Sequence, residues 1–422
     1  MRRAKRRCVV LWDTLSAVLN IGIVLGGLLF YGLVARILAR WWLSPALVLM
    51  GLAFVLSSAV LNFADVTATE TVISEVAIAA LATVLFTEAS LTDIRIAREV
   101  AAIPTRLLGI GLPLTVAFGA VLAHFFFPAM SWALAFVLAT ILAPTDAALG
   151  RPVVTNPAVP VKLRSALSIE SGLNDGLAVP ILLLALAVET GDSTRPFWLT
   201  LKVIGIGVGI GLLGGGLLGI LTNWLRQRDD FEPEWAGVIP ALAAIVIYVA
   251  ADHLEGSGFV AAFVGGIAYG ISRRRRAPVT EAELIPSVDI SVVLNGATWF
   301  LFGAIPLAYL VKSHPTWQVW LYAVLSLTVV RMIPVALSLI GTHAQLPTVA
   351  FTGWFGPRGL ASVVFLIVFL DAGTQSAAAK PLVQTAGLTI VLSVIAHGLS
   401  ATPLAAQYGR WAAKTPAHSI LR

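Results

Sequence analysis

The segment SALSIESGLNDGLAVPILLLALAV, residues 165–188, is long and apolar enough to cross a bilayer as one helix. It nevertheless contains two carboxylates, Glu170 and Asp175, together with Ser171 and Asn174. On a helix, Ser171 and Asp175 stack at i and i+4, as do Glu170 and Asn174, so the four side chains share one side. Ionisable groups inside an apolar span are costly and mark ion or proton pathways, although hydrogen bonds between packed helices are an alternative interpretation.

The composition indicates an all-α polytopic membrane protein. Of the 422 residues, 58% are hydrophobic and only 12% are charged, whereas soluble proteins carry about a quarter charged residues. The apolar runs are continuous and lack the alternation of a membrane β-barrel, which favours helices. At ~20 residues per crossing, we expect about thirteen transmembrane helices, near 15–36, 44–62, 74–91, 107–128, 131–148, 165–188, 199–222, 236–252, 256–271, 290–311, 317–340, 350–371 and 382–405.

Polar residues predict how the chain is divided. A polar loop at 273–290, the longest such break, separates a first part, 1–272, from a second part, 291–406. Together these parts form one transmembrane domain, 1–406, and residues 407–422 are expected to be a short cytoplasmic tail. We expect no separate soluble domain.

The basic residues predict the orientation. With a cytoplasmic C-terminus and thirteen spans, seventeen of the 28 Lys and Arg residues fall on the cytoplasmic side, as the positive-inside rule requires. The net charge of +6 therefore reflects membrane orientation and not a nucleic-acid partner. The basic arm at residues 2–7 conflicts with the rule, because the same count places the N-terminus outside. The apolar run behind the arm continues past Leu38 without a cleavage site, so we interpret it as a spanning helix and not a signal peptide.

Two sequence features favour packing over ligand binding. Gly209, Gly211 and Gly214 formally match a dinucleotide fingerprint, but they lie within an apolar span with no strand before them. Small residues at this spacing instead allow close contact between membrane helices. Cys8 is the single cysteine and the histidines show no metal-ligand spacing, so we expect no cofactor and no resident metal.

A second polar cluster, Pro144-Thr145-Asp146, ends the fifth span. Pro144 removes a backbone donor, and interrupted helices near the bilayer midplane expose carbonyls and helix ends that can coordinate a cation. Thr145 and Asp146 would supply oxygen ligands. The alternative is that Asp146 caps a turn at the membrane interface.

Two arginines lie inside apolar spans. Arg331 and Arg358 each need a partner at this depth, and a buried carboxylate is the simplest one. Glycines on both sides of Pro357-Arg358 also predict an interrupted twelfth helix. Interrupted helices in both halves are typical of transporters built from inverted repeats.

These motifs resemble those of the monovalent cation:proton antiporters. The resemblance rests on Pro144-Thr145-Asp146, on the segment 170–176, on Arg331 and on Gly356-Pro357-Arg358-Gly359. The electroneutral branch, with the NhaP-type sodium/proton antiporters, is the more similar one. The stretch 85–91 (LFTEASL) also resembles the third helix of that family.

The resemblance implies a role for each residue. Asp175 would exchange its ligand, and Asp146, Ser171, Glu170 and Thr145 would complete the site of the transported cation. Asn174, Arg331 and Arg358 would support it: Asn174 beside the ligands, Arg331 paired with Glu170, and Arg358 as a charge partner near the crossing helices.

The resemblance also implies one-for-one exchange of Na⁺ for H⁺, with K⁺ and Li⁺ left open, and a homodimer in a prokaryotic plasma membrane. Burial and a neighbouring carboxylate disfavour the charged form of an acid, so proton and cation can compete for Asp175. The protein is then not an enzyme and has no catalytic residues. An ion channel and an intramembrane aspartyl protease using Asp146 and Asp175 are the alternatives from other classes.

Overall fold

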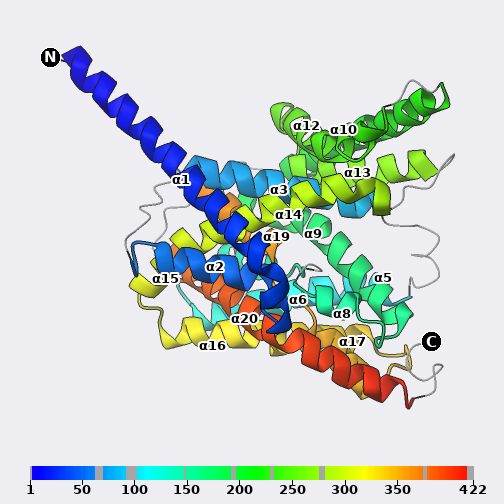
Figure 1. Cartoon of the computed structure of the whole chain (residues 1–422). Helices are drawn as coiled ribbons and strands as arrows, with labels where there is room; N and C mark the ends of the chain where they lie inside the picture. Colours follow the sequence, from blue (N-terminus) through cyan, green and yellow to red (C-terminus); the bar gives the residue numbers. More distant parts are fainter. Residues whose placement is uncertain are drawn as a thin grey trace.

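The computed structural model describes residues 2–61, 70–91, 102–146, 149–191, 196–228, 232–274, 281–373 and 378–415. Within these ranges the chain is helical and contains no strand, which agrees with the all-α class expected from composition. Figure 1 shows the helices in one assembly, with α1 projecting at the N-terminal end.

The described residues form a series of helices. In chain order they are α1 (Arg2–Arg40), α2 (Pro45–Leu56), α3 (Glu70–Leu91), α5 (Ala102–Arg106), η1 (Leu107–Gly111), α6 (Leu112–Phe126), α7 (Trp132–Ile141), α8 (Arg151–Val154), α9 (Val161–Thr190), α10 (Pro196–Gln227), α11 (Pro233–Ala236), α12 (Ile239–His253), α13 (Gly258–Arg274), α14 (Glu281–Phe302), η2 (Gly303–Leu307), α15 (Ala308–Lys312), α16 (Trp317–Leu327), α17 (Val329–Ser338), α18 (Leu346–Trp354), α19 (Leu360–Asp371) and α20 (Ala379–Ala412).

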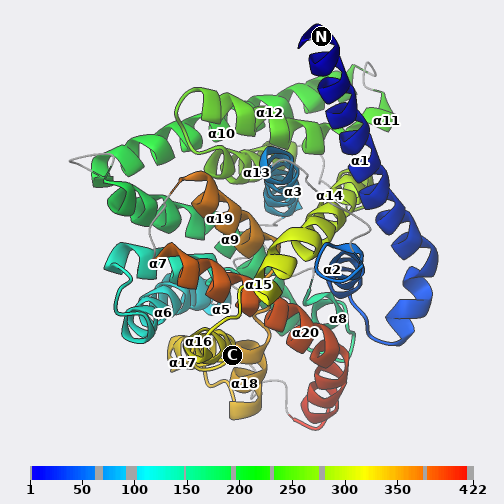
Figure 2. The ribbon, with the colours of Figure 1, turned by 90° about the vertical axis from the view of Figure 1, so that its left-hand side faces the viewer.

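The helices are those of a multi-pass membrane protein. Eight helical stretches in the described residues are long and apolar enough to cross a membrane. Five shorter apolar helices accompany them: α2, α7, α12, α13 and α19. The exact number of thirteen crossings stays a prediction. Helix α1, which lies along the edge of the assembly in Figure 2, buries only 6% of its apolar window, Asn20–Arg40, inside the protein. That surface is left for lipid or for a second copy.

Two expected boundaries are corrected by the structure. Helix α14 begins at Glu281, inside the stretch expected as the loop 273–290; residues 275–280 lie outside the described ranges. Glu283 accepts hydrogen bonds there from Arg226 and from the fully buried Arg273, and these ion pairs join the ends of α10, α13 and α14. Likewise α20 continues to Ala412, so the beginning of the expected tail is helical; residues 416–422 lie outside the described ranges. Tyr408 is buried there and stacks on Phe351.

The glycines of α10 pack this helix against α13. A Cβ on Gly207 or Gly211 would lie 2.7 or 2.6 Å from the carbonyl oxygen of Ser257 or Ala261, which is closer than real Cβ contacts allow. Gly215 faces the backbone of Gly265 in the same way, while Gly209 faces open space. The dinucleotide interpretation therefore fails, because all three fingerprint glycines lie in the middle of a helix, and Gly211 and Gly214 serve close packing.

We expect Gly215→Ala to destabilise the fold and Gly216→Ala to leave it intact or slightly stabilise it. Both changes favour the helix equally. The Gly215 Cβ would overlap Gly265, whereas a Cβ on Gly216 would meet no atom within 4 Å beyond its own stretch of helix. Overpacking of this kind costs about 1–3 kcal/mol. Thermal unfolding of the two purified variants in detergent measures the difference, and equal midpoints would contradict the packing interpretation.

Candidate cation-binding site

Two interrupted helices meet at the centre of the protein. Helix α7 ends at Ile141 and α8 begins at Arg151, while α18 ends at Trp354 and α19 begins at Leu360. The backbone N–H of Asp146 donates to the carbonyl oxygen of Pro357 at 2.8 Å. The two breaks therefore bond directly to each other, as expected for segments in which proline removes a helical donor.

Arg358 binds carbonyl oxygens at this crossing. Its Nη1 donates to Ala143 O at 3.0 Å and to Pro144 O at 3.3 Å, and its Nη2 donates to Ser326 O at 3.4 Å. Within the described residues no carboxylate lies within ion-pair distance of it, which corrects the expectation of a charge partner. The physical reason is that an interrupted helix leaves carbonyls without intrahelical donors, and a guanidinium can satisfy several of them.

Asp146 both caps backbone N–H groups and lines the cavity, so it combines the two roles, cap and candidate ligand, that the sequence left open. Its Oδ2 accepts from the N–H of Leu360 at 3.2 Å, so the carboxylate caps the N-terminus of α19. Its Oδ1 accepts from the N–H of Leu149 at 3.4 Å in the following turn. Gly359 must be glycine here, because a Cβ would overlap the Asp146 carboxylate. Asp146 also lines the cavity described below.

Glu170 and Arg331 form the expected ion pair. Arg331 Nη2 donates to Glu170 Oε1 at 2.6 Å, and both side chains are 2% exposed. Neither residue lines the cavity beside Asp175. Glu170 thus lies outside the cavity lining and is paired with Arg331, and its role as a cation ligand stays a prediction.

Thr145, Asn174 and Ser171 form a hydrogen-bonded chain behind the cavity. Asn174 Nδ2 donates to Thr145 Oγ1 at 2.6 Å, and Thr145 Oγ1 lies 3.1 Å from Ser171 Oγ. Only Ser171 of these three lines the cavity. Thr145 thus orients Ser171 and fixes the break at Pro144 to helix α9. Its own hydroxyl oxygen already takes part in hydrogen bonds with Ser171 and Asn174.

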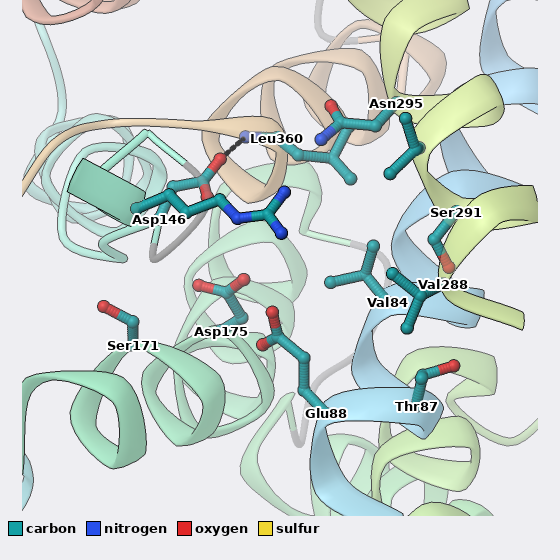
Figure 3. A pocket seen from close by; sticks show the side chains of 12 residues that line it. Val84, Thr87, Glu88, Asp146, Ser171, Asp175, Val288, Ser291, Asn295 and Leu360 are labelled. Carbon is teal, nitrogen blue, oxygen red and sulfur yellow. Dashed lines mark hydrogen bonds between the residues drawn. The ribbon is translucent and has the colours of Figure 1, made fainter. Parts of the chain in front are cut away.

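The cavity itself has a volume of about 250 Å³ and holds three carboxylates, those of Asp175, Asp146 and Glu88. Figure 3 shows them pointing toward one another, with Asp175 between the other two. Asp175 is 7% exposed, and its Oδ1 is buried with no hydrogen-bond partner among the described residues. The remaining lining residues are Val84, Thr87, Arg151, Ser171, Val288, Ser291, Val292, Asn295 and Leu360. Such a set of oxygens suits a hard monovalent cation.

Glu88 was missed as a site residue, although the sequence contained the signal. It lies on α3 within the span expected at 74–91, and its stretch, 85–91, was used only for the family resemblance. The argument applied to Asp175, that a carboxylate inside an apolar span marks an ion pathway, applies equally to Glu88. What the sequence lacked was the contact between α3 and α9, which lie far apart in the chain.

Comparison with known proteins identifies the family. The sequence model of the family described as "Sodium/hydrogen exchanger, transmembrane" matches residues 12–407. The chain belongs to this family. The sodium/proton antiporter MjNhaP1 of Methanocaldococcus jannaschii, solved at pH 8, superimposes with a TM-score of 0.76 at 20% identity, covering 93% of this chain and 99% of that one. That likeness supports the exchanger fold.

Characterised exchangers of two ion specificities resemble the chain. It is 28% identical over 289 residues to the low-affinity Na⁺/H⁺ antiporter NhaS1 of Synechocystis sp., covering 64% of this chain and 53% of that protein. It is 26% identical over 295 residues to the K⁺/H⁺ antiporter NhaP of Alkalimonas amylolytica, covering 67% of this chain and 48% of that protein. The chain thus spans about half the length of the curated relatives it matches.

We expect single variants of the buried ion pair to be much less stable than a variant that replaces both partners. Glu170→Gln or Arg331→Met alone leaves one buried partner unpaired, which costs about 3–5 kcal/mol, whereas replacing both partners by apolar side chains is often close to neutral. Thermal unfolding of Glu170→Gln, Arg331→Met and the double variant Glu170→Met/Arg331→Met measures this.

The control is Lys202→Met, which breaks the exposed pair with Glu255 (side chains 56% and 80% exposed). That change should alter stability by less than about 1 kcal/mol. A double variant no more stable than the worse single variant would contradict a simple charge-pair role.

Proposed function

We propose that this protein exchanges Na⁺ for H⁺ across the membrane, one for one, with the two ions competing for Asp175. The observation that carries the proposal is the position of Asp175: an intramembrane carboxylate with a buried, unpartnered oxygen that faces a cavity shared with Asp146 and Glu88. Membership of the exchanger family supports the same reaction.

The electrostatics of the cavity explain the competition. Three carboxylates and one guanidinium, that of Arg151, line the cavity. Because the carboxylates outnumber the guanidinium and repel one another, the site favours either a bound cation or a bound proton that lowers the negative charge. Glu170 lies outside this exchange because Arg331 already neutralises it. Asp146 is anchored by two backbone N–H groups, which keeps its carboxylate in place while Asp175 changes its ligand.

The two walls of the cavity support alternating access. Asp146, Ser171, Asp175 and Leu360 belong to the interrupted helices and α9, while the opposite wall comes from α3 and α14. Near the other end of α3, Ser74 Oγ donates to Asp371 Oδ2 at 2.6 Å, which joins α3 to the end of α19. Glu88 lies near the end of α3 that the charge distribution assigns to the cytoplasm, so we propose that this conformation is the one closed toward the outside. Relative movement of the two walls would reverse this.

Exchange of K⁺ for H⁺ is the second candidate, because one relative is named a K⁺/H⁺ antiporter and the same oxygen types can bind either ion. A plasma-membrane location in a prokaryote, a cytoplasmic C-terminus and a homodimer are proposed from the family resemblance and the distribution of basic residues.

We expect Asp175→Asn to abolish exchange without unfolding the protein, because the amide can no longer take up or release a proton. Proteoliposomes with an imposed pH gradient measure the dissipation on addition of Na⁺, K⁺ or Li⁺, with and without a membrane potential. The wild type should respond to a cation and be indifferent to the potential. Asp289→Asn, an exposed carboxylate on α14 outside the cavity lining, is the matched control.

Three results would contradict this proposal. Rapid exchange by Asp175→Asn would remove Asp175 from the mechanism. A cation flux in the wild type that proceeds without proton movement would indicate a channel. A rate that depends on the membrane potential would exclude one-for-one exchange.

A further inference from the structure

One face of helix α14 carries polar residues into the cavity, opposite Asp146 and Asp175. Val288, Ser291, Val292 and Asn295 line the cavity at helical spacings of i, i+3, i+4 and i+7. Figure 3 shows Ser291 and Asn295 on the α14 side of the cavity, across from Asp146 and Asp175. An asparagine in the middle of a membrane helix is costly unless its amide is used.

The hydrogen bonds of α14 distinguish Ser287, which has a structural role, from Ser291 and Asn295, which line the cavity. Ser287 Oγ donates to Gly237 O and accepts from the N–H of Ala241, so it holds the beginning of α12. Ser291 Oγ donates to Ser287 O at 2.9 Å, within its own helix, and its oxygen remains able to accept or to coordinate. Asn295 Oδ1 is buried and has no hydrogen-bond partner among the described residues. Buried acceptors without a partner are rare in folded proteins and call for an explanation.

The chemistry of the opposite wall supplies that explanation. The carboxylates of Asp175 and Asp146 lie on the wall opposite α14, so a cation bound to them would need further oxygens from the α14 side. An alkali cation that leaves water needs neutral oxygens in place of its lost hydration shell, and amide or carbonyl oxygens serve this purpose in selective ion sites. Asn295 Oδ1 and Ser291 Oγ are oxygens of this type on the α14 wall.

We propose that Asn295, assisted by Ser291, is a ligand of the transported cation supplied by the α14 wall, and that it sets selectivity among alkali cations. This inference rests on the proposed exchange at Asp175 and extends it. The number and spacing of neutral oxygens decide how well a site compensates a small or a large ion for its lost water, so removing one neutral oxygen alters affinities unequally. Because α14 belongs to the opposite wall from Asp175, this ligand is in place only when the two walls lie together.

The test compares Asn295→Leu, which keeps the approximate volume but removes the oxygen, with Val293→Leu on the outward face of the same helix, where Val293 is 52% exposed. In proteoliposomes, KM and kcat are measured separately for Na⁺, K⁺ and Li⁺. We expect Asn295→Leu to raise KM about three- to tenfold for the preferred cation, as for one lost ligand. The ratio of KM values between cations should change, and kcat should remain within about twofold. Asn295→Gln, which retains an amide oxygen, should recover part of the affinity, and Val293→Leu should match the wild type.

A second readout does not depend on transport. Addition of Na⁺, K⁺ or Li⁺ to purified protein in detergent should raise the unfolding temperature of the wild type, and this rise should be smaller for Asn295→Leu. If Asn295→Leu does not fold, Ser291→Ala is expected to shift the KM ratio in the same direction to a smaller extent.

Unchanged KM ratios in an active Asn295→Leu variant, or in Ser291→Ala where Asn295→Leu does not fold, would overturn this inference and leave the exchange at Asp175 intact. An equal loss of kcat for every cation with unchanged KM would also overturn it, because it would indicate a role in helix movement. A wild type without any cation-dependent proton flux would instead overturn the proposed function itself.

Discussion

The hydrogen bond between the N–H of Asp146 and the carbonyl of Pro357 is the constraint on which the site depends. Two helices stop in the middle of the protein, and neither could do so alone, because unpaired backbone groups in an apolar interior cost several kcal/mol each. Each break supplies hydrogen-bonding groups that the backbone of the other break lacks. Arg358 donates to the carbonyls that end α7, and Asp146 accepts from the N–H that begins α19. The crossing is therefore stable only as a pair.

This crossing also arranges the charges of the site. Arg358 and Arg331 are both fully or nearly fully buried, but their positive charge is directed to carbonyl oxygens and to Glu170. Asp146 is stabilised by the N-terminus of α19, where the helix dipole favours a negative group. Glu170 and Asp175 of α9 each keep one oxygen without a hydrogen-bond partner among the described residues, but Glu170 is paired with Arg331, whereas Asp175 faces the cavity. A site that must release its ion needs such a group, since a carboxylate locked to an arginine could not exchange its ligand.

Much of the fold and part of the site could be predicted from the sequence, for identifiable reasons. Proline and glycine around Asp146 and Arg358 mark the two breaks, because these residues act on their own backbone. The Glu170–Arg331 pair was suggested by the family resemblance and is formed. Glu88 and Asn295 were not included, because their relevance depends on which wall their helices form, and that contact is not encoded locally. Glu170 was grouped with the ligands because the family resemblance implied it, whereas its position outside the cavity lining is decided by how the helices pack.

The glycines of α13 and α10 give the α3 wall its rigidity. A Cβ on Gly266 or Gly270 of α13 would overlap or crowd the carbonyl oxygens of Phe86 or Ser90, which lie two residues before and after Glu88. Helix α13 therefore holds the backbone of α3 on both sides of that carboxylate, and α10 in turn holds α13 through Gly215. Close glycine contacts of this kind let helix backbones pack tightly. Glu88 therefore belongs to a tightly packed group of helices, α3, α13 and α10, and its position relative to Asp175 depends on how α3 packs against α9.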